Sequence, residues 1–115
     1  MSIQRFHVGP RLSEMALYNN TLYLAGQVAG DPSQNITSQT TQVLAAIDKL
    51  LAEAGSDKGK ILSATIYVAD MADFAAMNVV WDAWVEQGST PPRATVQAAL
   101  AKPDYKVEIQ IVAGK

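Results

Sequence analysis

Stretches with helical periodicity alternate along this chain with stretches that have the periodicity of strands. In the first helical stretch the apolar residues recur on one face, at Val43, Ile47, Leu50, Leu51 and Ala54. A second stripe, whose tryptophans we interpret as packing residues, follows at Phe74, Met77, Trp81, Trp84 and Val85. Between them, residues 61–68 are rich in β-branched and aromatic residues, which is typical of a strand. One helix therefore stands in each of two crossovers, and the simplest packing is a single mixed sheet with both helices on one face.

Further strands complete the predicted α+β fold, whose element order is β-β-β-α-β-α-β-β. They are expected at residues 3–7, 14–18, 21–25, 93–98 and 105–112. Asn19 and Asn20 tolerate positive φ and predict a hairpin between the second and third strands. Gly55 is expected to cap the C-terminus of the first helix. Asp70 is expected to cap the N-terminus of the second helix, which should end at Gly88.

Alternation along the strands predicts which side chains face the helices. The side chains assigned to the helix face are Leu62, Ala64, Ile66 and Val68, then Ala94, Val96 and Ala98, and finally Val107, Ile109 and Ile111. The opposite face then carries a mixed set that includes Ile61, Tyr67, Arg93, Thr95 and Glu108. Two interpretations stay open for this second face. It meets solvent, as is common in antiparallel sheets, or it forms a subunit interface with polar clefts.

Composition excludes several classes of site. A chain of 115 residues predicts one domain, over residues 1–115. The chain has no cysteine and one histidine, His7, so thiolate chemistry and Cys-ligated metals are excluded, and a Ser–His triad or histidine-rich metal site is hard to build. The net charge of -2 argues against a nucleic-acid surface. We expect a cytoplasmic protein, because the sequence shows neither a membrane span nor the apolar core of a signal peptide.

An arginine stands at the start of one predicted strand, directly after two prolines. Pro91 and Pro92 stiffen the backbone ahead of Arg93, because proline fixes φ and also restricts the residue before it. The base of the arginine is therefore well placed, and its planar guanidinium can bind a carboxylate through two parallel hydrogen bonds. The alternative is an ordinary surface or intersubunit salt bridge.

Three other residues are candidates for the same site. If the last two strands pair, Glu108 lies on the face of Arg93, where it can position a water or move a proton; otherwise it is a solvated charge or the salt-bridge partner of Arg93. Asn78 interrupts an apolar stripe, and its amide either ties the helix to a neighbouring segment or contacts a ligand. Gly26 permits close approach of the backbone, although turn geometry explains it equally well.

The segments together resemble the RidA family, also called YjgF or L-PSP. The stretches that carry the resemblance are LYLAGQVA (22–29), GKILSATIYVADMADFAAMN (59–78), PPRATVQAAL (91–100) and YKVEIQIVA (105–113). The resemblance implies a chorismate-mutase-like fold that forms homotrimers, with a central barrel of sheets, helices outside and clefts between subunits. It also implies hydrolysis of reactive 2-enamine and 2-imine acids, of the 2-aminoacrylate type, to 2-oxo acids and ammonia, without a metal or organic cofactor.

The resemblance assigns roles to the candidate residues. It implies that Arg93 binds the substrate carboxylate and that Glu108 is the late-strand glutamate of the site, with Asn78 and Gly26 as further site positions.

The chain departs from the family pattern at three positions. Ala25 stands where a serine is usual, Arg11 where a tyrosine is usual, and Thr95 where a cysteine is frequent. Arg11 and Thr95 are therefore kept as candidate ligand residues. Arg11 is either a second cation that would favour a larger or more acidic ligand, or a side chain that points into solvent. The missing hydroxyls favour a first alternative, a trimer that binds small carboxylates without turnover. The resemblance also brings in a second alternative, a ribonuclease, which the acidic composition and the lack of a His acid–base pair disfavour.

Overall fold

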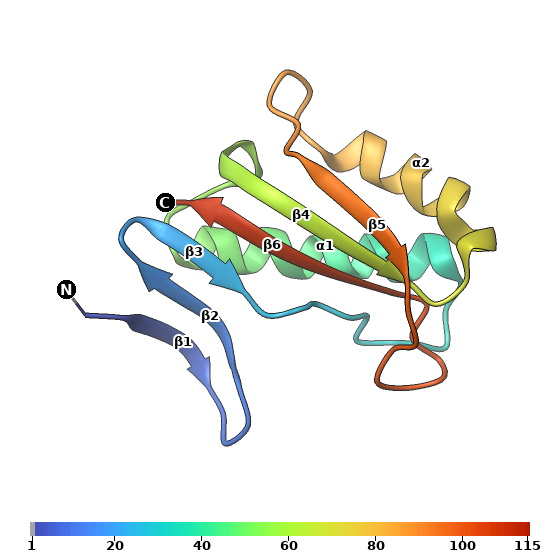
Figure 1. Ribbon diagram of the computed structural model, residues 1–115, viewed down its shortest axis with the longest axis horizontal. Coiled ribbons are helices and arrows are strands. Elements are labelled where there is room, and N and C mark those ends of the chain that lie inside the picture. The colour runs from blue at the N-terminus through green and yellow to red at the C-terminus, as the bar shows by residue number, and fades with distance from the viewer. Residues whose placement is uncertain (1) are drawn as a thin grey trace.

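The computed structural model describes residues 2–115 and contains one mixed sheet with two helices behind it (Figure 1). The strand order is β1-β2-β3-β6-β4-β5, in which β4 and β5 are parallel and the other neighbours antiparallel. The strands are β1 (Gln4–Val8), β2 (Ser13–Tyr18), β3 (Thr21–Leu24), β4 (Ile61–Val68), β5 (Arg93–Gln97) and β6 (Val107–Gly114). The predicted α+β fold with a single mixed sheet is confirmed.

The first helix, α1 (Ile36–Glu53), ends as its sequence predicts, whereas its N-terminal cap was not predicted. Its N-terminus is capped by Asn35, whose side chain accepts a hydrogen bond of 2.9 Å from the Ser38 backbone N–H. At the C-terminus Gly55 has φ of 77°, and the Ser56 N–H reaches back to the Leu51 carbonyl at 2.8 Å. This left-handed residue just after the helix confirms the role predicted for Gly55.

The second helix, α2 (Phe74–Trp84), is shorter than predicted at both ends. Asp70 caps a 3-10 turn, η2 (Met71–Asp73), through the Ala72 N–H rather than capping α2 itself. The helix ends at Trp84 and not at Gly88, because Val85 turns to extended backbone and buries its side chain. No helix within residues 2–115 is long and apolar enough to cross a membrane.

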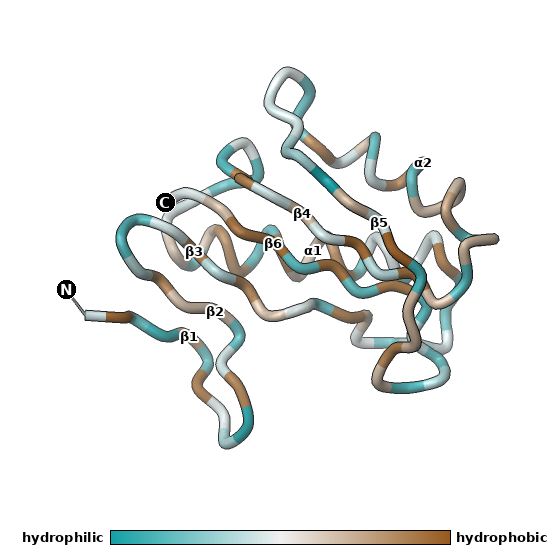
Figure 2. The backbone as a smooth tube through the Cα atoms, in the orientation of Figure 1, coloured by the Kyte–Doolittle hydropathy of each residue, from teal (hydrophilic) through white to brown (hydrophobic). Residues whose placement is uncertain are grey.

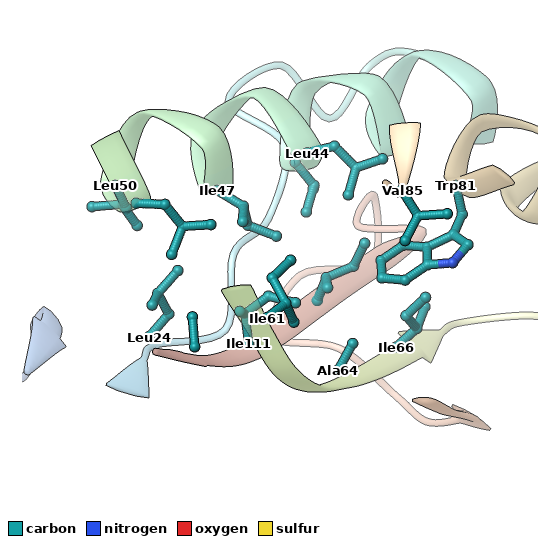
Figure 3. Close-up of a cluster of buried hydrophobic side chains, with 14 of the residues drawn as sticks. Leu24, Leu44, Ile47, Leu50, Ile61, Ala64, Ile66, Trp81, Val85 and Ile111 are labelled. Carbon is teal, nitrogen blue, oxygen red and sulfur yellow. The ribbon is translucent and has the colours of Figure 1, made fainter. Parts of the chain in front are cut away.

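The core lies between the two helices and the sheet. In Figure 3 side chains of α1 point toward the sheet, while Trp81 of α2 and Val85 lie above Ile66 of β4. Burying a large apolar side chain contributes about 1.5–3 kcal/mol, so this layer dominates the stability of the fold. Its completely buried members include Val43, Ile47 and Leu51 of α1 and Ile66, Ile109 and Ile111 of the sheet.

Burial alternates strictly along β6, and up to Ile111 hydrophobic and hydrophilic residues alternate with it (Figure 2). It fails at the start of β4, where the register against β6 shifts between Ile61 and Ser63. The irregularity turns Ile61 into the core and leaves Leu62 53% exposed. The prediction that Leu62 faces the helices and Ile61 the opposite side is therefore wrong.

The face predicted for β5 is also wrong, along its whole length. Arg93 pairs with Ala64 and Thr95 with Ile66, so these side chains lie on the helix side, while Val96 points to the open face and is 42% exposed. The reason is that β5 is an edge strand, which follows the register of β4 and borders α2 only along its margin. The central strand β6 needs one apolar face because the helices cover it, whereas the edge strand β5 does not.

Candidate functional site

The predicted site residues fall into two groups on opposite faces of the sheet. Arg93 lies on the helix side at one edge, close to Asn78 of α2. Glu108 lies on the open face beside Gly26. The prediction that the last two strands pair and bring Arg93 and Glu108 to one face is wrong, because β4 lies between β5 and β6.

The first group, the arginine group, consists of Arg93, Asn78, Trp81 and Thr95. The Arg93 guanidinium donates a hydrogen bond of 2.8 Å to the Asn78 amide oxygen. Its central carbon lies 5.5 Å from the centroid of the Trp81 ring, within the range of a cation–π contact. The diproline lead-in docks on β4, where the Pro92 carbonyl accepts from the Ala64 N–H at 3.1 Å. The half-buried Arg93 side chain is thus fixed at its backbone end by the docked prolines and at its guanidinium by the amide and the indole.

Within residues 2–115, no carboxylate pairs with the charged guanidinium of Arg93. The salt bridge found in this part of the chain joins His7 and Glu53. Its contacts are a neutral amide and an aromatic ring. Within one chain the salt bridge considered as an alternative does not form, and the amide of Asn78 ties α2 to β5. The guanidinium therefore keeps its charge available to an anion.

Thr95, two residues further along the same side of β5, has an unusual hydroxyl. Its Oγ1 is buried and has no hydrogen-bond partner within the described chain. Leaving such a group unsatisfied costs about 1–3 kcal/mol, so the site carries a polar atom that the single chain does not use. A ligand role for Thr95 stays a prediction.

The second group, the glutamate group, consists of Gly26 and Glu108 with the residues around them. A Cβ added to Gly26 would meet the Glu108 carboxylate, with its carboxyl carbon only 2.8 Å away. The Gln27 N–H donates to the Ile109 carbonyl at 2.8 Å, and the Ile109 N–H donates back to Gln27 at 3.1 Å. This bridge presses the chain at Gly26 against β6. Close approach, rather than a turn with positive φ, therefore explains the glycine.

A pocket of about 290 Å³ opens at the glutamate group. Sequence reasoning did not assign Tyr67 or Gln110 to it. The alternation of β6 could have identified Gln110, whereas the β4–β6 register that places Tyr67 there could not be read from the sequence. Tyr67 pairs directly with Glu108 across the two strands, and Gln110 follows Glu108 by two residues on the same face. The pocket is lined by Gly26, Tyr67, Ala98, Ala99, Leu100, Ala101, Glu108 and Gln110.

Two further features lie away from both groups. Arg11 is exposed in the bend between β1 and β2, and no hydrogen bond or ion pair joins it to another residue of the described chain. A hollow of about 380 Å³ between α1 and α2 is lined partly by Asp48, Lys58 and Trp84, and none of the predicted site residues borders it. The ligand role of Arg11 stays a prediction.

Chemically, the two groups are complementary. The arginine group offers several N–H donors to a carboxylate, since Asn78 uses one donor of the guanidinium. The glutamate group offers a half-exposed carboxylate in a polar pocket, which can hold a water or transfer a proton. Residues 2–115 gather no cluster of three His, Asp or Glu side chains suited to a metal ion.

Comparison with known proteins gives consistent results in sequence and in structure. Residues 3–115 match the family described as Endoribonuclease L-PSP. A RutC family protein of Haemophilus influenzae is 53% identical over 114 residues, covering 98% of each chain. A 2-iminobutanoate/2-iminopropanoate deaminase of Mus musculus is 32% identical over 112 residues, covering 92% of this chain and 82% of the mouse protein.

Among solved structures, a member of the YjgF protein family from Neisseria meningitidis superimposes with a TM-score of 0.97. It is 50% identical, and the match covers 100% of this chain and 96% of the other. Both the sequence match and the superposition include the strands that carry Arg93 and Glu108. The chain therefore belongs to the RidA/YjgF/L-PSP family.

Proposed function

We propose that the protein hydrolyses 2-imino acids, together with the 2-enamine acids in equilibrium with them, to 2-oxo acids and ammonia. The observation that carries this proposal is the guanidinium of Arg93, which is positioned by Asn78 and Trp81 and is not neutralised by any carboxylate of the described chain. Family membership supports it, as do relatives about one-third identical, from mouse and goat, that are named 2-iminobutanoate/2-iminopropanoate deaminase.

We further propose that the two groups meet between copies of the chain, in a cytoplasmic homotrimer whose sheets form a central barrel. Arg93 and Glu108 point away from each other within one chain, so a site that uses both needs a second copy. Apolar side chains on the open face support such packing. Tyr23 of β3 is 50% exposed and Val96 of β5 is 42% exposed, and packing against another copy would remove this apolar area from water.

The reaction follows from the chemistry of the two groups. Arg93 holds the substrate carboxylate and favours the imine form, in which the carbon next to the carboxylate is electrophilic. Glu108 and the backbone at Gly26 hold a water that adds to this carbon, while a proton passes to the imine nitrogen. The resulting carbinolamine releases ammonia and leaves the 2-oxo acid. No covalent bond to the protein forms, and the balance is one water in and one ammonia out.

Replacement of Arg93 tests the proposal most directly. Arg93→Ala should lower ammonia release from enzymatically generated 2-iminopropanoate at least about 100-fold, because a charge-assisted contact to the carboxylate is lost. Arg93→Lys keeps the charge without the planar fork and should recover part of the activity. The assay follows ammonia against the spontaneous rate in buffer, and gel filtration checks that each variant has the wild-type oligomeric state. Wild-type protein that shows no rate above buffer would overturn the proposed reaction.

The glutamate group is tested independently. Glu108→Gln removes the proton acceptor and should lower kcat about 100-fold while ligand affinity changes little. Gly26→Ala forces the carboxylate of Glu108 aside and should have a similar but weaker effect. A matched control is Gly30→Ala, because a Cβ at Gly30 meets nothing within 4 Å. Equal activity losses in Gly26→Ala and Gly30→Ala would contradict the assignment.

A second candidate function is binding of small carboxylates without turnover. It is favoured by Ala25, which supplies no hydroxyl next to Gly26 in the glutamate group. In that case calorimetry would detect saturable binding of 2-oxobutanoate that Arg93→Ala abolishes, and the ammonia assay would stay at the rate of buffer.

A further inference from the structure

We propose that Trp81 is the positioning residue of Arg93, and that the face of its indole sets the orientation in which the guanidinium receives a ligand carboxylate. The inference rests on the proposed function in one respect, namely that Arg93 is the carboxylate site. Trp81 is 5% exposed and packs in the core, so its ring is a fixed surface. The guanidinium carbon lies 5.5 Å from the ring centroid.

Two contacts from one helix face restrain the guanidinium together. Asn78 and Trp81 are three residues apart on α2, so both reach the same side of the helix. The Asn78 oxygen fixes one guanidinium nitrogen at 2.8 Å, and the indole restrains the rest of the group. Because a hydrogen bond alone leaves the group free to rotate about it, the ring supplies a restraint that Asn78 cannot.

The aromatic partner also preserves the charge. A ring attracts a cation through its quadrupole and carries no net charge, whereas a carboxylate in the same place would neutralise the guanidinium. The indole further shields one side of Arg93 from water, which strengthens the attraction of the exposed side for an anion. A tryptophan is the side chain best suited to both tasks, since it gives the strongest cation–π contact.

The molecule contains its own control for this inference. Trp84, on the same helix, lies beneath a second cation, with Lys58 Nζ 5.3 Å from its ring. Its indole N–H donates to Asp48 at 2.8 Å, and it borders the hollow between the helices rather than either site group. Trp84 therefore has the same chemistry as Trp81 without contact to Arg93. Its ring packs against that of Trp81, with the centroids 5.5 Å apart, so a control variant has to keep an aromatic ring at position 84.

The first test measures binding of 2-oxobutanoate by calorimetry, which needs no turnover. Trp81→Leu should weaken binding roughly two- to thirty-fold, the range expected for one cation–π contact. Trp81→Phe keeps an aromatic face and should recover most of the affinity, while Trp84→Phe, which keeps a ring packed against Trp81, should bind as the wild type does. Circular dichroism and thermal melts show whether each variant is folded. Wild-type affinity in Trp81→Leu, or equal losses in the Phe and Leu variants, would overturn the positioning role.

The second test is spectroscopic and does not depend on a destabilising variant. The chain has two tryptophans, so Trp84→Phe leaves Trp81 as the single indole. Its fluorescence should change when 2-oxobutanoate neutralises Arg93, and should not change in the Trp84→Phe, Arg93→Ala double variant. The matched Trp81→Phe protein, which reports from Trp84, should show no response. A response from Trp84 with none from Trp81 would overturn the inference.

The two proposals fail in different ways. If Arg93→Ala leaves the affinity for 2-oxobutanoate unchanged, or the wild type does not bind it, the carboxylate site itself is wrong and the role of Trp81 falls with it. If Arg93→Ala abolishes binding while Trp81→Leu does not weaken it, the site stands and only the positioning role is wrong.

Discussion

Both edges of the sheet are tied to a helix by one basic side chain, but the two ties differ in charge balance. At the β1 edge, His7 Nε2 lies 2.8 Å and 3.0 Å from the two carboxylate oxygens of Glu53 on α1. At the β5 edge, Arg93 donates to the neutral amide of Asn78 on α2. Each contact joins an edge strand to a helix, β1 to α1 in the first case and β5 to α2 in the second.

The charge of the partner distinguishes a purely structural contact from one that leaves a ligand site open. At the β1 edge the Glu53 carboxylate lies against His7, so whenever the imidazole is protonated its counter-ion is already inside the chain. A guanidinium that faces an amide and a ring is positioned without being neutralised, which is the state that a site for an anion requires.

Asn78→Asp replaces the neutral amide that contacts Arg93 at the β5 edge with a carboxylate, as in the contact of His7 with Glu53 at the β1 edge. The new carboxylate would sit within hydrogen-bond distance of Arg93 and compete with the ligand for it. Affinity for 2-oxobutanoate should fall about 10- to 150-fold, the equivalent of one hydrogen bond to a charged group, while thermal stability is kept or raised. Calorimetry and melting curves measure the two quantities.

Asn78→Ala is the control for this change, because it removes the amide without adding a charge. Its loss of affinity should be smaller than that of Asn78→Asp. An aspartate variant that binds as well as the wild type would show that Arg93 does not have to remain free of an internal counter-ion.

His7→Ala should have the smallest effect. The imidazole is 52% exposed and its partner 35%, so solvent screens the pair and its loss should cost less than about 1 kcal/mol of unfolding free energy. Deaminase activity should stay within about twofold of the wild type. Urea titration and the ammonia assay measure both values. A large loss of activity would mean that the β1 edge takes part in the site and would remove the contrast between the edges.

Much of the fold follows from sequence because the central elements obey simple periodicities. The helical stripe of α1 and the alternating burial of β6 are dictated by a core that covers one face of each element, and the glycine after α1 by the left-handed backbone that ends the helix. The exceptions have local causes. A bulge at Ile61 and Ser63 changes the phase of β4 without any mark in composition. The edge strand β5 takes its facing from its pairing with β4, which a single strand does not reveal.

The site was predictable residue by residue but not as an arrangement. The prolines before Arg93 and the polar break at Asn78 identified two members, and the structure joins them through a hydrogen bond. Trp81 was assigned to packing, which its burial in the core confirms; its contact with Arg93 was not predicted, although its spacing of three residues from Asn78 was a usable signal. The relation between Arg93 and Glu108 depends on strand order. A short turn between consecutive strands favoured pairing, yet β4 intervenes.

The opposite facing of Arg93 and Glu108 has a consequence for inheritance. If each complete site draws one residue from each of two neighbouring molecules, a chain that lacks the arginine and a chain that lacks the glutamate are both inactive alone. Co-expressed in one cell, they form mixed rings in which some junctions pair an intact arginine with an intact glutamate. Two loss-of-function alleles of such a gene would then complement each other, because the mixed assembly rebuilds an intact site from two defective chains.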